Sequence, residues 1–185
     1  MSYSSYYAEA EHGKWEIELL KYPKEEDWLL CKQLALNTVW KGSEKAPSEE
    51  WKKKILTAEH SPIRCLWFVI KMVGIPYYIS NHFVRHKHGV EHFVSSQRND
   101  RQQMYDRTQA PQDAPVNHIL YVNAQELMNM AHRRLCGQAD EKTQEIMQAI
   151  CARVEWACPE FVGLLVPMCK YRGKCPEMKP CGRLK

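Results

Sequence analysis

The chain of 185 residues carries a net charge of +4, with 44% hydrophobic and 26% charged residues. These values are typical of a folded chain long enough to bury a core, and they exclude disordered and collagen-like classes. The most apolar run, residues 65–79, is interrupted by Lys71, Gly74 and Pro76, so we expect no membrane-spanning segment. The first residues do not form a secretory signal, which favours a cytoplasmic protein with reduced cysteines.

The positive charge is concentrated at the C-terminus. Residues 169–185 contribute +5, so the preceding residues sum to about −1. We therefore expect no general polyanion-binding surface and no nucleic acid as a partner. We expect residues 1–168 to form one domain and residues 169–185 to form a basic tail that contains Cys169, Cys175 and Cys181.

In the first half of the chain, alternation and helical spacing of apolar residues predict strands and helices in turn. They are a strand over 15–21, a helix over 25–40, a helix from Ser48 to about His60, a buried strand over 64–73 and a helix from Pro76 to about Lys87. The fold class expected from this order is α+β, a single domain with a β-sheet packed against several helices.

In the second half, residues 89–116 are polar, irregular and rich in Arg and Gln, which predicts a long functional loop. Asn123, with Glu126 three residues later, predicts a capping box at the start of a helix. Gly137 ends that helix, and a second amphipathic helix is predicted over 139–157.

Glycine-rich phosphate loops are absent from the sequence, as are the GxSxG and HExxH motifs. A bound phosphate would therefore depend on side-chain cations, which gather in one segment: Arg85, Lys87, Arg98, Arg101 and Arg107. Guanidinium groups match phosphate oxygens well. The alternative is a solvated loop whose arginines pair with Glu91, Asp100 and Asp106.

Two segments contain residue types that could bind a metal ion. His82 and His86 are one helical turn apart, but no cysteine or carboxylate nearby completes a familiar ligand set. The three cysteines of the tail are spaced more widely than those of zinc sites. We expect no metal, and we favour a basic tail that lies on a neighbouring subunit or near a ligand phosphate.

Several blocks follow one another in the order of a known signature. His60-Ser61-Pro62 precedes an apolar strand, and Arg85-His86-Lys87 is followed after seven residues by Ser95. Arg107 with Pro111, and then Asn123, Asn129 and Arg134, continue the pattern. Together these blocks resemble the flavin-dependent thymidylate synthases. The chain departs from that family's pattern at Lys87 and Gln125, each in place of Arg, and at His82 in place of Gln.

The resemblance implies a fold like that of the thymidylate synthase-complementing proteins, in a homotetramer whose active sites lie between subunits. It implies FAD as cofactor, with NADPH and methylenetetrahydrofolate as co-substrates and a pyrimidine deoxynucleotide monophosphate, dUMP, as the substrate that is methylated to dTMP. The departures leave a hydroxymethylase, or a preference for dCMP, as an alternative. A non-catalytic nucleotide-binding or nucleic-acid-binding module is the alternative of a different class.

The resemblance also assigns residues. The cofactor-binding residues it implies are His60, Ser61, Arg85, His86, Lys87, Asn123, Gln125 and Asn129. The substrate-binding residues it implies are Arg85, Ser95, Ser96, Arg98, Arg107 and Arg134. A cation that polarises the pyrimidine would be the catalytic group, and Arg134 is the candidate.

A purely structural role could also explain some of these residues. His60 and Ser61 could simply end a helix before Pro62, and the position of Asn123 suits a helix cap equally well. On a helix Asn129 and Arg134 are about 140° apart, so they should not face one small ligand together. They would then contact opposite ends of an extended ligand, or different sites across a subunit interface.

Overall fold

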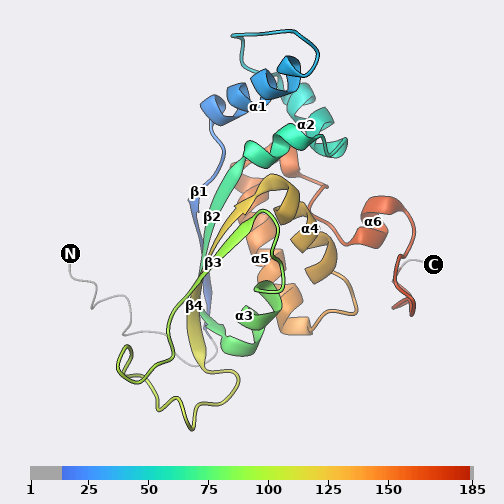
Figure 1. Cartoon of the computed structure of the whole chain (residues 1–185). Coiled ribbons are helices and arrows are strands. Elements are labelled where there is room, and N and C mark those ends of the chain that lie inside the picture. Colours follow the sequence, from blue (N-terminus) through green and yellow to red (C-terminus); the bar gives the residue numbers. More distant parts are fainter. Residues whose placement is uncertain (1–13, 184–185) are drawn as a thin grey trace.

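Four antiparallel strands form the sheet, in the order β1-β2-β4-β3, within residues 14–183, which the computed structural model describes (Figure 1). They are β1 (Glu16–Lys21), β2 (Trp67–Pro76), β3 (Val90–Val94) and β4 (Pro115–Asn123). β4 lies between β2 and β3, so Val122 is opposite both Phe68 and Val90.

Helices cover one face of this sheet (Figure 1). The helices of the described residues are α1 (Glu25–Asn37), α2 (Glu49–Thr57), α3 (Tyr77–Phe83), α4 (Ala124–Arg134), α5 (Glu141–Ala157) and α6 (Met168–Arg172), with 3-10 turns η2 (Ser61–Cys65) and η3 (Pro159–Phe161). α3, α4 and α5 contact the sheet directly. This single α+β domain confirms the expected fold class.

The core forms between the helices and the sheet because alternate strand residues point to the same face. Phe68, Ile70 and Met72 of β2 and Leu120 of β4 are completely or almost completely buried on that face. Phe68 packs edge-on against Phe161, with 5.4 Å between the ring centroids. β4 therefore has a core-facing side and a side that the helices do not cover.

Side-chain caps begin three of the helices, and two of these caps lie at predicted helix starts. Ser48, Asn123 and Asp140 each accept a hydrogen bond from the backbone N–H three residues later. Only one of the two hydrogen bonds of the predicted capping box is formed, that from the N–H of Glu126 to the side chain of Asn123. The backbone N–H of Asn123 donates to the carbonyl of Gly89 and not to the side chain of Glu126. The Glu126 carboxylate is thus available for other partners.

The main error of the sequence analysis concerns residues 89–116, which are not one loop. β3 occupies Val90–Val94 and β4 begins at Pro115, so the irregular segment is shorter than predicted. β3 contains the polar residues Glu91 and His92, so its sequence does not show the apolar pattern of a strand. The strand forms because it pairs with β4.

Several predicted boundaries also shift. The strand predicted over 64–73 starts at Trp67, because η2 occupies the residues before it. Pro76 is the last residue of β2 and precedes α3, which ends at Phe83 rather than near Lys87.

The first two helices are shorter than predicted as well. The helix predicted over 25–40 ends at Asn37, and Trp40 has a left-handed backbone with φ of 58°. The helix predicted to reach His60 ends at Thr57, and Glu59 has φ of 50°. None of the helices in residues 14–183 has the length and apolar character needed to cross a membrane.

Gly89 allows the turn before β3 to approach α4. Its φ is 72°, and a Cβ atom placed on it would lie 2.4 Å from Nδ2 of Asn123. We expect Gly89→Ala to lower the free energy of unfolding by about 2–3 kcal/mol, because it adds both left-handed strain and a clash. Urea denaturation measures this change.

The matched control is Gly42→Ala. A Cβ on Gly42 would meet nothing within 4 Å, so this substitution should change stability by less than about 1 kcal/mol. Equal effects of the two substitutions would contradict the close approach of the turn to Asn123.

Candidate functional site

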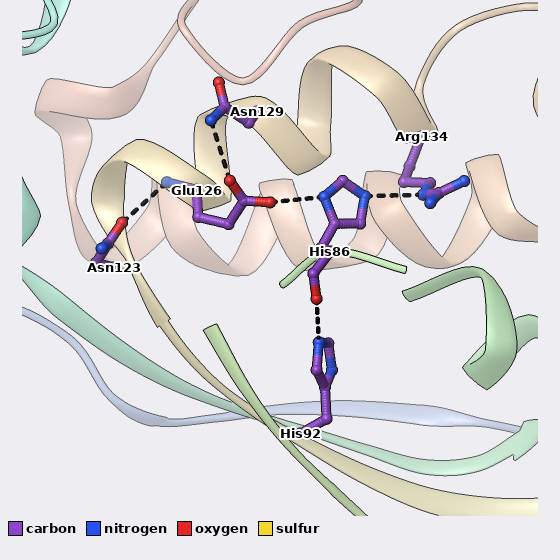
Figure 2. Close-up of polar contacts among 6 residues, drawn as sticks. All are labelled: His86, His92, Asn123, Glu126, Asn129 and Arg134. Carbon is purple, nitrogen blue, oxygen red and sulfur yellow. Dashed lines mark hydrogen bonds and ion pairs between the residues drawn. The ribbon is translucent and has the colours of Figure 1, made fainter. Parts of the chain in front are cut away.

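A hydrogen-bonded group of side chains lies where the turn after α3 meets the first three turns of α4 (Figure 2). Glu126, on α4, is 8% exposed, and its Oε1 lies 2.7 Å from Nδ1 of His86. Its other oxygen, Oε2, accepts a hydrogen bond of 3.0 Å from Nδ2 of Asn129. Arg134 closes the group, because its Nε donates to Nε2 of His86 at 3.1 Å.

The structure thus brings together four of the residues that the resemblance assigned: His86, Asn123, Asn129 and Arg134. Asn129 and Arg134 belong to one hydrogen-bonded group although they point in different directions from the helix. The ring of His86, which comes from outside the helix, lies between Glu126 and Arg134 and links the two ends of α4 (Figure 2).

The backbone of His86 is held from the sheet side. Nε2 of His92, on β3, lies 2.8 Å from the carbonyl oxygen of His86 (Figure 2). Nδ1 of His92 lies 3.0 Å from Nε2 of His118, and Nδ1 of His118 lies 3.0 Å from the hydroxyl of Ser80. This chain of contacts runs from α3 through β4 and β3 to the turn that carries His86.

Two cations without counter-ions among the described residues flank His86 in the chain. Arg85 and Lys87 are exposed and form no ion pair with any residue of the described segment 14–183. Burial lowers the pKa of Arg134, and the positive charges of Arg85 and Arg133 lower it further. Repulsion among cations in a partly desolvated place favours the binding of an anion.

The terminal nitrogens of Arg134 are available to a ligand. Its Nε is used by His86, and within residues 14–183 no hydrogen bond or ion pair engages the other two nitrogens. An arginine held by one nitrogen in this way presents its remaining donors in a fixed direction.

The polar loop after β3 holds the other predicted substrate residues. The hydroxyl of Ser95 accepts from the N–H of Asn117, and that of Ser96 accepts from the N–H of Arg98. Arg98 forms a two-bond fork with Asp100, both bonds at 2.8 Å. For Arg98 this is the ion-pair alternative that the sequence left open.

Arg107, in the same loop, is exposed, and its side chain forms no ion pair with a described residue. The loop also encloses a cavity of about 410 Å³ against the start of β4. The residues that line this cavity are Ser95, Ser96, Asp100, Arg101, Gln102, Gln103, Met104, Tyr105, Pro115, Val116 and Asn117.

Within one chain this loop and the turn at Gly89 lie at opposite ends of β4. Ser95 is paired with Asn117 near the start of β4, whereas Gly89 is bonded to Asn123 at its end. Six residues of strand separate Asn117 from Asn123, which is about 20 Å at 3.3 Å per residue. Figure 1 shows the loop at the end of the sheet away from α4.

The remaining predicted cofactor residues lie at the start of η2 and at the first turn of α4. His60 and Ser61 are exposed. The backbone N–H of His60 donates to a carbonyl of α2 at 3.3 Å, so His60 belongs to the end of that helix, as the structural alternative suggested, and Ser61 begins η2. Gln125 donates from Nε2 to Oε2 of Glu59 at 2.7 Å. Oε1 of Glu59 accepts at 2.9 Å from the hydroxyl of Tyr171, in the C-terminal segment.

Glu126, His92 and His118 are the polar residues that sequence reasoning missed. The capping-box position of Glu126 accounts for its place in the sequence, and no local pattern indicates its contact with His86. His118 lies two residues from each of the buried residues Val116 and Leu120, so all three share one face of β4. That spacing is the only signal in the sequence that His118 is buried in the core. His82, in contrast, contacts Thr143 and not His86, and residues 14–183 contain no group of three or more metal ligands.

The fold of this chain, but not its sequence, resembles that of known proteins. No protein-family model matches the sequence, and no curated protein matches it. Solved structures do share its fold, and they include thymidylate synthase X from Helicobacter pylori, determined with FAD and dUMP. The superposition has a TM-score of 0.63 and covers 82% of this chain and 97% of that one. Sequence identity is 11%, so the likeness is one of fold.

The buried His118 should make stability depend on pH. Burial, with a smaller contribution from His92, lowers its pKa to about 3 from the ordinary value of 6.5. Below pH 6.5 the unfolded chain therefore binds a proton that the folded chain does not. The free energy of unfolding should fall by about 1.4 kcal/mol from this group between pH 7.5 and 5.5.

The measurement is urea denaturation at the two pH values for the wild type, His118→Gln and His88→Gln. The first substitution should remove about 1.4 kcal/mol of the pH-dependent loss. The second should leave the loss unchanged, because His88 is exposed. An unchanged loss in His118→Gln would contradict a neutral, buried His118.

Proposed function

We propose that this protein is a flavin-dependent enzyme that transfers a one-carbon unit to a pyrimidine deoxynucleotide. The reaction we propose is methylation of dUMP to dTMP with methylenetetrahydrofolate and NADPH. The observation that carries the proposal is the group of uncompensated cations around His86 and Arg134, in a fold like that of a protein that binds FAD and dUMP.

The residues around the turn fit FAD as an anionic, extended cofactor. Arg85 and Lys87 are exposed and unpaired within the described residues, so they can bind the two phosphates. Asn123, Gln125 and Asn129 add amide groups along α4, although Gln125 would have to exchange its contact with Glu59. Bound FAD would supply hydride transfer.

Arg134 is the group that we assign to the pyrimidine. Its free nitrogens can donate to a carbonyl oxygen of the base and stabilise negative charge that develops there. A guanidinium that is partly buried does this more effectively than a solvated one, because water does not screen it. His86 holds the arginine in place without neutralising it.

We propose that Arg107, Ser95 and Ser96 bind the nucleotide phosphate from a second copy of the chain. In one chain their loop and the turn at Gly89 lie at opposite ends of β4, and we propose that the two halves of the site come from two chains. The uncovered face of the sheet offers an apolar surface for such an assembly, with Trp67 stacked on Tyr121 and Phe93 60% exposed.

The alternatives make different predictions for the purified protein. A hydroxymethylase would bind the same flavin but leave a hydroxymethyl group on the base. A nucleotide-binding module without catalysis would carry no flavin absorbance. The visible spectrum of the purified chain, followed by mass analysis of the product from dUMP, therefore separates all three functions.

Substitution of Arg134 tests the site directly. In the flavin-loaded protein, Arg134→Ala should weaken dUMP binding about 10- to 100-fold, because it removes charge-assisted hydrogen bonds of about 1.5–3 kcal/mol. Titration of the flavin spectrum with dUMP measures the dissociation constant.

The matched control is Arg133→Ala. Arg133 is the preceding residue, but it is largely exposed and lies 3.9 Å from Glu177 of the tail. Its loss should change dUMP affinity less than twofold. If both substitutions weakened binding equally, net charge rather than the placed guanidinium would explain the effect. If the wild type bound no dUMP, the assignment of dUMP as substrate would be wrong.

Assembly gives an independent test. We expect light scattering to report about four copies of the 21.7 kDa chain. Chains with Arg134→Ala and chains with Arg107→Ala, each inactive alone, should recover part of the activity when they are assembled together. Such mixtures contain sites in which one chain supplies Arg134 and another supplies Arg107.

The control mixture combines Arg134→Ala with Arg85→Ala. These two residues lie in the same half of the site and on the same chain, so no mixed assembly restores both. Recovery in this control, or no recovery in the first mixture, would contradict a site shared in the proposed way.

A further inference from the structure

The contacts of His86 fix the position of its ring proton. Nε2 of the ring faces Nε of Arg134 at 3.1 Å, and an arginine nitrogen can only donate. Nε2 must therefore be the unprotonated acceptor. Nδ1 faces Oε1 of Glu126 at 2.7 Å, so Nδ1 carries the proton and donates it to the carboxylate. His86 is neutral in this arrangement.

Glu126 is what selects this tautomer. Its side chain and that of His86 are only about a tenth exposed, so water screens the carboxylate little. Asn129 holds one oxygen at 3.0 Å, and the backbone N–H of Glu126 is bonded to Asn123 at 2.9 Å. The negative charge is thus fixed beside Nδ1, where it stabilises a proton on that nitrogen.

Arg134 depends on this choice in turn. Were the proton on Nε2, that nitrogen would face the guanidinium as a second donor, and the bond at 3.1 Å could not form. With the proton on Nδ1, Nε of Arg134 is anchored. The terminal nitrogens of Arg134, which have no partner within residues 14–183, then keep one direction.

We infer that Glu126 is a positioning residue for the ligand of Arg134: it contacts no ligand, and it acts by fixing the tautomer of His86, which in turn orients the guanidinium. The ligand itself, a pyrimidine nucleotide, rests on the proposed function. The tautomer does not, because it follows from contacts within the chain.

The test begins with the free protein. Nitrogen-15 NMR of the histidine rings distinguishes a protonated Nδ1 from a protonated Nε2, and a His86→Gln variant identifies the signals of His86. We expect the wild type to show Nδ1–H alone. Glu126→Gln keeps the shape but removes the charge, and its amide can donate as well as accept, so this variant should show a mixture of the two tautomers.

The surface variant Glu145→Gln is the control. Glu145 pairs only with Lys142 on α5 among the described residues, so its loss should leave the spectrum of His86 unchanged. A pure Nδ1–H tautomer in Glu126→Gln overturns the inference, whatever the ligand.

The second arm is a double-mutant cycle on dUMP binding in the flavin-loaded protein. Glu126→Gln alone should weaken dUMP about 10-fold, and in the Arg134→Ala background it should weaken dUMP less than twofold further. An effect that is equally large in both backgrounds overturns the inference, because Glu126 would then act independently of Arg134.

The two arms separate this inference from the proposed function. If the wild type binds no dUMP, the proposed function fails, and the tautomer arm alone decides the role of Glu126. Should Glu126→Gln not fold, His86→Gln breaks the same link from its centre. Unchanged dUMP affinity in His86→Gln overturns the inference.

Discussion

One hydrogen bond, between the carboxylate of Glu126 and the ring of His86, joins the two halves of this molecule at the site. Glu126 belongs to α4, and His86 belongs to the turn that leads from α3 into β3. The turn can reach the helix only because Gly89 has no side chain beside Asn123. Without that approach, Arg134 would lose its contact with His86 and the nearby charge of Arg85.

The C-terminal segment adds a second layer to the same helix. Tyr171 packs on His132, with 4.4 Å between the ring centroids, and donates to Glu59, which also accepts from Gln125. Burial and the nearby Glu59 raise the pKa of Tyr171 to about 12, so it remains a donor across the neutral range. Glu59 thereby links the segment to Gln125, one of the residues at which the chain departs from the pattern that it resembles.

The likeness to a known structure is one of fold and not of sequence. At 11% identity the chain shares a fold with thymidylate synthase X over 82% of its length. A backbone can persist at such low identity because alternation and volume specify a sheet and its helices, and many sequences satisfy both. The polar residues at the junction of α4 with the turn are held by hydrogen bonds to one another, which volume and alternation alone do not specify.

Local signals in the sequence were enough to predict the α+β class and most helix starts. They also identified the polar residues of α4 that the structure brings together. Ser48, Asn123 and Asp140 cap helices because their side chains bond the backbone nearby, and such contacts span only three residues. β3 could not be found this way, since its pairing with β4 is a contact between distant segments. The same reason hid the link from Glu126 to His86, 40 residues apart, and the separation of Ser95 from that site. Only the tertiary structure brings such residues together or holds them apart, because hydrogen bonds of this kind depend on position in space rather than on spacing along the chain.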